Sequence, residues 1–553
     1  TTACLVVLIS AGFGLRKIET SVQLLKLFDE DARIIRDYTW LETNFGKLVP
    51  MELVLRVPPS MQSDASASQD DSEESSSATG LNILERVEAV ARIGKVINGT
   101  LGEPGLDVVG AVTAVNTFIK PLPGITNSWN PVRSQYVTEL SQGRDELLRN
   151  EYVRIEEKGP FSGSELWRIS LRVGALSDVD YGEFIQTLRT SVEPVLRAYD
   201  TRDQILTELA TNQQLAGTKQ PRVVMIGATE PKSLDEIVLI EPKGDESKPD
   251  RERILKRDIY LATLGELLRG EQIREPLWLN HRSATKPIEI GGPLWEKVVA
   301  KSDVIVWVDD DPVPTLSLAN AKSVVDGQSI FSKSITHQLV EGKTPNAKGA
   351  GALQVVYTGV VPVVYKAQRT LLGSLVQSIG LAFVLIAVVM IVLLNPSNGL
   401  GMLRPSNGFS GIMAGFISMI PNMFPVLLVF GLMGHAGRLV DIGTMMTASV
   451  AMGVAVDDTI HFLSWFRSFI DKGFDRVKAV ELTYRRVGPA MTQTTIVGGL
   501  GLFVFALSTF TPTQRFGTPM LILLSAALVG DLVLLPAPVS YTHLTLPTNT
   551  VTW

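Results

Sequence analysis

Two adjacent aspartates and a histidine stand inside a long apolar stretch of this sequence, Gly453-Val-Ala-Val-Asp457-Asp458-Thr-Ile-His461. His461 follows Asp457 by four residues and Asp458 by three, the two spacings that bring side chains together on a helix. A charge at mid-membrane costs on the order of 3 kcal/mol, so such residues are retained where they pair, line a cavity or move ions. Close carboxylates titrate as a coupled unit, and histidine changes charge near neutral pH. The pattern predicts a proton relay.

Three other interpretations of this segment stay open. The polar residues could form a hydrogen-bonded packing cluster that moves no proton. The run 439–466 could be a buried helix of a water-soluble protein, although neighbouring runs of near-spanning length argue against it. An intramembrane aspartyl protease would need Gly-x-Gly-Asp, whereas Val454 and Val456 stand at the two glycine positions before Asp457. We therefore expect no enzyme, and no cofactor apart from protons as the coupling ion.

The elements that must position these residues are predicted membrane helices. A spanning helix needs roughly 20 mostly apolar residues, and the C-terminal third holds five such runs. A sixth run, before Arg16, lacks the basic flank of a signal peptide. We expect it to be a membrane helix cut on its N-terminal side, so that the chain is a fragment. The predicted spans are 1–15, 371–394, 411–433, 439–466, 490–509 and 518–537.

Basic residues predict the orientation of these helices. Segment 467–488 carries six Lys and Arg residues, and the positive-inside rule places it in the cytoplasm. Alternation of the helices then puts residues 16–365 on the outer side, although Arg16 and Lys17 run mildly against the rule there. Helices 2–6 would occupy 366–539.

Residues 16–365 are expected to form a mixed α/β domain inserted between helices 1 and 2. Short Val- and Ile-rich runs alternate with helical patterns, as in βαβ units. Two polar stretches, near 59–80 and 241–252, are predicted to be disordered insertions. The predicted strands are 51–57, 167–173, 222–226, 304–308 and 353–357, and the clearest predicted helices are 83–97 and 181–199.

Composition argues against several function classes. The 553 residues carry a net charge of −6 without a basic block, so a nucleic-acid partner is not expected. The single cysteine, Cys4, excludes an intrachain disulfide and a cysteine metal site. The sequence has no Gly-x-x-x-x-Gly-Lys-Ser/Thr loop, so ATP is not the expected energy source. Asp309, Asp310 and Asp311 could bind a cation, but a solvated turn after a strand is the simpler interpretation, and we predict no metal site.

The motif Gly-x-x-x-Asp-Asp in the fourth helix of a six-helix repeat resembles the resistance-nodulation-division (RND) superfamily. Its form here, from Gly453 to His461, is most similar to Patched-like predicted exporters, relatives of the MMPL lipid exporters. The resemblance covers nearly all of 1–538 and is weak within 60–350. Further similar passages are Leu41 to Gly46, Ile420 to Pro425, Gly488 to Thr492, Leu507 to Phe510 and Asp531 to Pro536.

The resemblance implies a multi-pass exporter of the bacterial inner membrane, driven by protons, with 16–365 as a periplasmic porter-like domain. The substrate would be hydrophobic or lipid-like. Asp457 and Asp458 would bind the transported proton, and His461 would assist. Family members have two halves, and this chain looks like the C-terminal one, so the missing half would be a partner; a homo-oligomer is also compatible. The alternative is a Patched-like lipid sensor or export-accessory protein without cargo of its own.

Several residues are predicted to support the relay. Gly453 would permit close helix contact, or would be a packing glycine without a mechanistic role. Thr492, Thr494 and Thr495 could hydrogen-bond across to the carboxylates, and back-bonding to their own helix is an equal alternative. Asp531 is a further intramembrane acid, near the cytoplasmic end of its helix.

Two remaining segments complete the predictions. Pro421 and Pro425, with Asn422 between them, are expected to bend their helix as a hinge or as a static kink. Residues 540–553 break off an apolar run without the expected basic flank. They resemble translated adapter sequence, and we expect them to be an artefactual tail.

Overall fold

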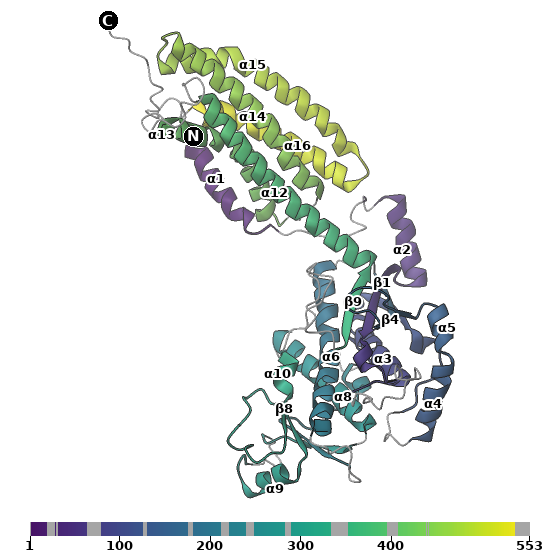
Figure 1. The fold of residues 1–553 in the computed structure, drawn as a ribbon. Coiled ribbons are helices and arrows are strands. Elements are labelled where there is room, and N and C mark those ends of the chain that lie inside the picture. Colours follow the sequence, from purple (N-terminus) through teal and green to yellow (C-terminus); the bar gives the residue numbers. More distant parts are fainter. Residues whose placement is uncertain are drawn as a thin grey trace. The chain divides into compact units, whose positions relative to one another are not determined.

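The structure is a computed structural model in which the chain divides into two compact units. One unit comprises Thr1–Trp40 and Val364–Trp553, and the other comprises Leu41–Val363. Figure 1 shows the ribbon of the chain and labels many of its helices and strands. The expected tail, 540–553, lies outside the described residues. The described residues are 2–18, 28, 31–63, 79–124, 130–174, 181–211, 220–238, 248–271, 273–282, 289–332, 352–394, 408–437, 440 and 442–536.

The first unit is helical. Three of its helices are long and apolar enough to cross a membrane, at Val360–Val389, Arg476–Leu507 and Thr511–Leu534. The remaining three predicted spans stay a prediction. One of them, 439–466, contains the two adjacent aspartates, which lower its mean hydropathy. The elements are α1 (Thr2–Leu15), α12 (Val360–Leu394), α13 (Gly408–His435), α14 (Ile442–Asp471), α15 (Arg476–Phe503), η6 (Val504–Leu507), α16 (Thr511–Val529) and the π-helical turn η7 (Gly530–Leu534).

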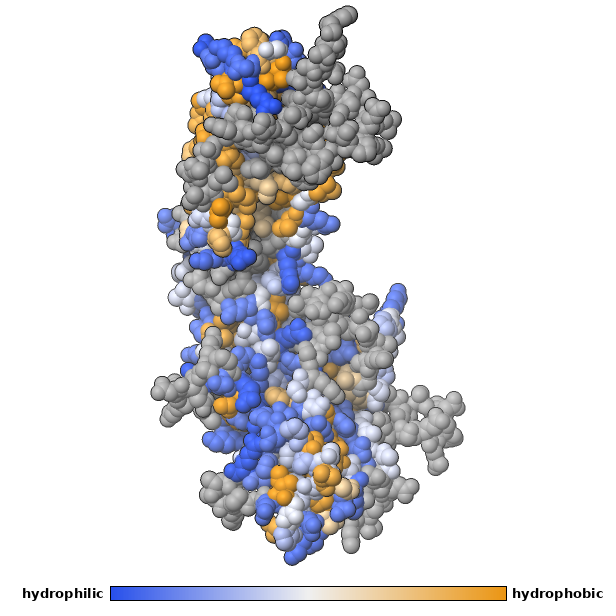
Figure 2. All heavy atoms as spheres, turned by 90° about the vertical axis from the view of Figure 1, so that its left-hand side faces the viewer, coloured by the Kyte–Doolittle hydropathy of each residue, from blue (hydrophilic) through white to orange (hydrophobic). Residues whose placement is uncertain are grey.

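The outer surface of the helical unit is largely apolar. Figure 2 shows apolar residues gathered over this unit, where α12 alone exposes several large aliphatic side chains. Exposed apolar side chains in this number suit contact with lipid rather than with water. The exposed aliphatic residues of α12 include Leu371, Val376, Leu381, Val384, Leu385 and Val388.

Inside the helical unit, side chains from five elements share one core. Ala387 of α12 and Met419 of α13 pack with Phe462 of α14, Met491 of α15 and Leu535 after η7. Each helix therefore contributes an inward apolar face, and the polar residues of α14 must be divided between this core and the outer surface.

Glycines let α1 and α13 approach closely. A Cβ atom built on Gly431 would overlap the backbone of Ala11, and one on Gly14 would overlap the backbone of Gly431. Gly434 meets the backbone of Gly14 in the same way. Small residues at such a crossing allow backbone contact between helices that share no hydrophobic drive in lipid.

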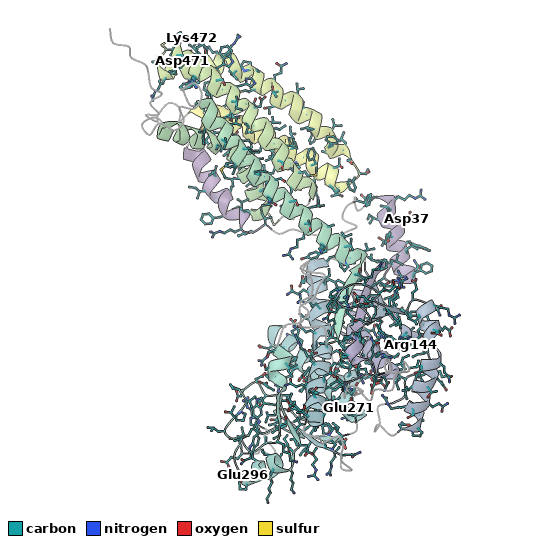
Figure 3. All side chains as sticks on the ribbon, viewed as in Figure 1. Asp37, Arg144, Glu271, Glu296, Asp471 and Lys472 are labelled. Atoms are coloured by element: carbon teal, nitrogen blue, oxygen red, sulfur yellow. The ribbon has the colours of Figure 1, made fainter. Side chains whose placement is uncertain are left out.

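The predicted cytoplasmic segment 467–488 is mostly helical. α14 continues to Asp471 and α15 begins at Arg476, where the side chain of Asp475 accepts a hydrogen bond from the backbone N–H of Lys478. Figure 3 labels Asp471 and Lys472 at this end of α14. Lys, Arg and Glu are good helix formers, so both helices extend beyond their apolar parts.

The second unit has mixed α/β structure, as predicted. Its first sheet is antiparallel, with strand order β2-β4-β1-β9 and β3 paired to β4. The central strand β1 places Leu53 opposite Ile169 on one side and Tyr357 on the other, and all three side chains are buried. The strands are β1 (Val49–Val57), β2 (Val109–Ala114), β3 (Val153–Ile155), β4 (Glu165–Val173) and β9 (Gln354–Gly359).

The second sheet is parallel, in the order β6-β5-β7-β8. Helices connect its first three strands, which confirms the predicted βαβ units. Ile226, Ile305 and Trp307 of this sheet pack on Trp295 and Val299 of α9. The strands are β5 (Arg222–Ile226), β6 (Arg274–Leu279), β7 (Val304–Trp307) and β8 (Val324–Asp326).

Helices cover these sheets. α3 begins with a capping box, in which Asn82 Oδ1 accepts from Glu85 N at 3.0 Å and Glu85 Oε2 accepts from Asn82 N at 2.8 Å. Buried ion pairs join the layers, such as Arg86 of α3 with Glu165 of β4 at 3.2 Å. The helices of this unit are η2 (Pro59–Met61), α3 (Ile83–Leu101), η3 (Val115–Thr117), α4 (Pro131–Gln142), α5 (Arg144–Arg149), α6 (Tyr181–Thr211), α7 (Leu234–Val238), α8 (Lys248–Gly270), α9 (Pro293–Lys301) and α10 (Gly327–Ser332). A further helix, α2 (Arg33–Phe45), has residues in both units and buries none of them.

The two predicted disordered insertions are wrong at their edges. Residues 248–252 form the start of α8, where Pro249 fits the first turn of a helix because its missing N–H is not needed there. Residues 59–63 hold η2 and a bridge from Gln62 to Leu81. The remaining parts of the two predicted insertions, 64–78 and 241–247, lie outside the described residues.

Candidate functional site

α14 presents its polar residues on two different faces. Its inner face is apolar and buried, with Ala451, Ala455 and Phe462. A second face is exposed, and Gly453, Asp457, His461 and Ser464 follow one another along it at helical spacing. Because Asp457 and Asp458 are neighbours on a helix, they cannot both lie on this exposed face.

The predicted contact between Asp457 and His461 is present. His461 Nε2 lies 3.6 Å from Asp457 Oδ1, and the two side chains are 61% and 70% exposed. An imidazole and a carboxylate at this separation can exchange a proton through a bridging water or a small movement. This pair forms an outward site on the surface of the helical unit.

Asp458 points the other way and is 6% exposed. The structure therefore brings Asp457 and His461 together on the exposed face and places Asp458 on the buried side of α14, from which it still interacts electrostatically with both. The physical reason is the turn of about 100° per helical residue, which carries the second aspartate from the outer face into the bundle.

A second polar group lies inside the bundle, next to Asp458. Asp531 of η7 is 1% exposed, and Thr459 and Asn422 are fully buried beside it. Thr459 Oγ1 lies 2.6 Å from Asp531 Oδ1, 2.9 Å from Asn422 Oδ1 and 3.0 Å from the carbonyl oxygen of Ala455. Three elements, α13, α14 and η7, thus supply one residue each to a buried hydrogen-bonded group.

The π-helical turn η7 sets the position of Asp531. A Cβ atom built on Gly530 would lie 3.1 Å from the carbonyl oxygen of Pro421, so this glycine lets η7 approach α13. The hydroxyl of Tyr484 on α15 donates to the carbonyl oxygen of Leu532 in the same turn. π-helical turns within helices occur often at functional sites.

The predicted supporting residues differ in their roles. Thr492 and Thr494 donate to carbonyl oxygens of their own helix, Gly488 at 2.8 Å and Ala490 at 3.0 Å, which is the back-bonding alternative. Thr495 is buried. A Cβ atom built on Gly453 would meet no atom within 4 Å among the described residues, so close packing at this glycine is not observed there.

The predicted kink residues belong to the interior of α13. Pro421, Asn422 and Pro425 are all buried, and the helix runs from Gly408 to His435 without ending at either proline. Asn422 is therefore a member of the buried polar group as well as a neighbour of Pro421. The two prolines indicated a bend in this helix, and they did not indicate that the Asn422 side chain contacts Thr459.

The acidic turn after β7 is neutralised by cations. Arg282 lies 3.1 Å from Asp309 and also pairs with Asp311, while Arg257 lies 3.6 Å from Asp310. Asp310 and Asp311 are exposed, as a solvated turn requires, whereas Asp309 is buried beside His281 and Arg282. Over the described ranges, no group of three or more His, Cys, Asp or Glu residues could hold a metal ion.

Comparison with protein-family models and with curated proteins gives no match to this chain. The resemblance of its motifs therefore stays an interpretation of the sequence. The candidate site therefore consists of two polar groups, one exposed on α14 and one buried between α13, α14 and η7.

Proposed function

We propose that this chain is one six-helix half of a secondary exporter that couples proton movement to the export of a hydrophobic or lipid-like substrate. The observation that carries the proposal is the placement of three carboxyl groups and an imidazole within an apolar helical unit. Asp458 and Asp531 are buried there, and Asp457 and His461 share its surface. Ionisable groups at such positions are costly and are retained where ions move.

The proposed mechanism is a change of helix packing on protonation. A proton arriving at Asp457 or Asp458 removes a negative charge from α14, and the helices around it then pack differently. The movement would reach Leu41–Val363, the α/β unit, which would alternate its access to the substrate. No step in this cycle needs a nucleotide or a metal.

The proposal includes a second six-helix half. Asp457 and His461 are 70% and 61% exposed on a surface that is otherwise apolar, and a charged face is costly toward lipid. A partner half that covers this face would bring complementary polar groups to it. We place the assembled protein in the bacterial inner membrane, with the α/β unit on the periplasmic side.

The test uses the full-length protein in lipid vesicles with an imposed pH gradient. A pH-sensitive dye reports proton movement, and a lipophilic dye and a fluorescent phospholipid serve as separate cargo probes. We expect Asp457→Asn and Asp458→Asn each to abolish cargo-dependent proton flux without reducing insertion. Asp471→Asn, at the exposed end of α14, is the matched control and should retain the flux.

Two results would count against this function. Normal transport by both variants would remove the relay. Proton binding without movement of either cargo probe would favour the alternative, a lipid sensor or export-accessory protein.

A further inference from the structure

Asp531 is the most deeply buried carboxyl group of the helical unit among the described residues. Its side chain is 1% exposed, and its Oδ2 atom has no hydrogen-bond partner in the part of the chain that the structure describes. An unsatisfied buried carboxylate oxygen costs free energy that a bound proton would recover. A buried carboxyl group in this position favours its neutral, proton-bound form over the ionised one.

The hydroxyl of Thr459 has three acceptors within reach. They are Asp531 Oδ1 at 2.6 Å, Asn422 Oδ1 at 2.9 Å and the carbonyl oxygen of Ala455 at 3.0 Å. A hydroxyl group carries a single proton, so Thr459 can donate to only one of them at a time. The shortest of the three distances is to Asp531, the acceptor that becomes strongest when it is ionised.

We propose that Asp531 is a proton-binding site of the helical unit and that the Thr459 hydroxyl reports its charge state to Asn422. With Asp531 ionised, Thr459 donates to Asp531 Oδ1. With a proton added to Oδ1, the resulting acid donates to Thr459 Oγ1, and the Thr459 hydroxyl rotates to donate to Asn422 Oδ1. Oδ2 then becomes a neutral carbonyl oxygen, which loses less free energy without a partner than a carboxylate oxygen does. One proton joins one carboxylate, no covalent bond breaks elsewhere, and the hydroxyl keeps its own proton.

The receiving end of this switch lies at a weak point of α13. Pro425 has no N–H, so it cannot donate the usual intrahelical hydrogen bond to the carbonyl oxygen of Pro421, four residues earlier. That oxygen faces Gly530, the residue before Asp531. A change of hydrogen bonding at Asn422 therefore acts on a stretch of helix that has fewer backbone bonds to break.

Asp531 has charged and titratable neighbours on the helices packed against it. From α14, the carboxyl group of Asp458 acts on it electrostatically, and from α15, Tyr484 donates to Leu532. α14 also carries Asp457 and His461 on its exposed face, and α15 carries Glu481, Arg485 and Arg486 within one turn of Tyr484. In α12, α13 and α16 the titratable residues are Tyr365, Lys366, Arg369, His435 and Arg515.

This inference deepens the proposed proton coupling and rests on it for the consequence of protonation, whereas binding of the proton is tested without any cargo. Infrared difference spectra of the full chain in lipid, acidic minus alkaline, show the carbonyl band of each carboxyl group that takes up a proton. We expect one such band to be lost in Asp531→Asn and retained in the control Asp471→Asn. Asp531→Glu keeps a carboxyl group and should return a band at a shifted frequency.

Thr459 is tested in the same spectra. Thr459→Val removes the hydroxyl at nearly constant volume and should shift the frequency of the Asp531 band, because the acid loses its acceptor. Thr459→Ser keeps the hydroxyl and should leave the frequency in place. A shift of equal size in both variants would remove Thr459 from the switch.

Three further outcomes would overturn the proton site. In the first, the carbonyl band persists in Asp531→Asn. In the second, no band changes on substitution of Asp531, whether the pH is lowered or raised. Sodium in place of choline at constant pH could erase the band, which would mean that a metal cation occupies the site instead. Failure of the exporter proposal is read separately, since transport by Asp457→Asn would end that proposal while the Asp531 band stayed in place.

Discussion

Asp457 and Asp458 are neighbours in sequence but occupy different environments. Asp457 shares an exposed surface with His461, whereas Asp458 lies inside the bundle. The spacing of the motif predicted the contact at the surface, because helix geometry alone brings residues four apart together. It could not predict which carboxyl group would be buried, because that depends on how α14 packs against other helices.

The same limit explains why Thr459 was missed. In the sequence it is one threonine among several in apolar runs, and its role depends on two elements distant along the chain, α13 and η7. Asn422 and Asp531 are also polar residues within apolar runs, and this shared feature could have suggested that their side chains meet inside the bundle. Their meeting at one hydroxyl is a property of the tertiary structure.

The first prediction concerns His461. We expect His461→Ala to move the half-maximal points of the transport–pH profile, because it removes the imidazole 3.6 Å from Asp457. The profile is measured in vesicles at a fixed pH difference. His435→Ala is the matched control, since His435 contacts the backbone of Ser10 and stands outside the polar groups. An unmoved profile in His461→Ala would exclude this histidine from the mechanism.

The second prediction concerns Asp203 in the α/β unit. Burial raises the pKa of its carboxyl group to about 7, and Arg202, with Nη1 at 2.8 Å, lowers it in part. Because the pKa in the folded state lies above the usual value of 3.8, the folded protein holds the extra proton. The stability that this group contributes is therefore present at low pH and is lost as the pH rises through about 7.

Asp203→Asn should remove this contribution to the pH dependence of stability. The slope of the free energy of unfolding against pH should then change by up to about 1.4 kcal/mol per pH unit. The measurement is denaturant unfolding of the full chain at a series of pH values, followed by tryptophan fluorescence. Asp235→Asn removes an exposed ion pair with Lys95 and serves as the control. Equal slopes for Asp203→Asn and the parent protein would contradict the assignment.

At the scale of elements, hydrophobic patterns predicted many of the strands and helices of the α/β unit. All five predicted strands and both clear helices are present, because each is a Val- and Ile-rich run or a long amphipathic stretch. β2, β3, β6 and β8 were not predicted. Val109–Ala114 contains Gly and Ala, Arg274–Leu279 contains Glu and Pro, and Val153–Ile155 and Val324–Asp326 are three residues long. Whether strands pair parallel or antiparallel is decided by connections between distant segments.

The third prediction tests how α1 holds to α13. Gly431→Ala would place a Cβ atom into the backbone of Ala11, so we expect a loss of roughly 1–3 kcal/mol in the free energy of unfolding. Alanine otherwise favours a helix over glycine by about 1 kcal/mol. Gly498→Ala on α15, where a Cβ atom meets nothing within 4 Å among the described residues, should therefore be neutral or stabilising. Unfolding in mixed detergent micelles measures both, and equal effects would argue against a close crossing.

At the scale of the whole molecule, the two units use different physical chemistry. The helical unit exposes many large apolar side chains, whereas the α/β unit contains buried ion pairs such as Arg202 with Glu271 at 2.6 Å. Figure 3 labels Glu271 in the α/β unit. This division fits one unit in lipid and one in water, and it makes the orientation of the chain a testable quantity.

The last prediction is that orientation. In a Cys4→Ser background, a single cysteine replaces either Glu296 on α9 or Lys472 just after α14. Both residues are exposed, and Figure 3 labels both. The positive-inside rule predicts that Lys472 lies in the cytoplasm, and in the proposed six-span topology three crossings, at 371–394, 411–433 and 439–466, separate it from the α/β unit. A membrane-impermeant maleimide added to intact spheroplasts should label Glu296→Cys. It should label Lys472→Cys only after the membrane is opened by detergent. Labelling of Lys472→Cys alone before detergent would show that the orientation, and with it the proposed direction of export, is reversed. Labelling of both before detergent would show that an even number of crossings separates them and would contradict the proposed topology.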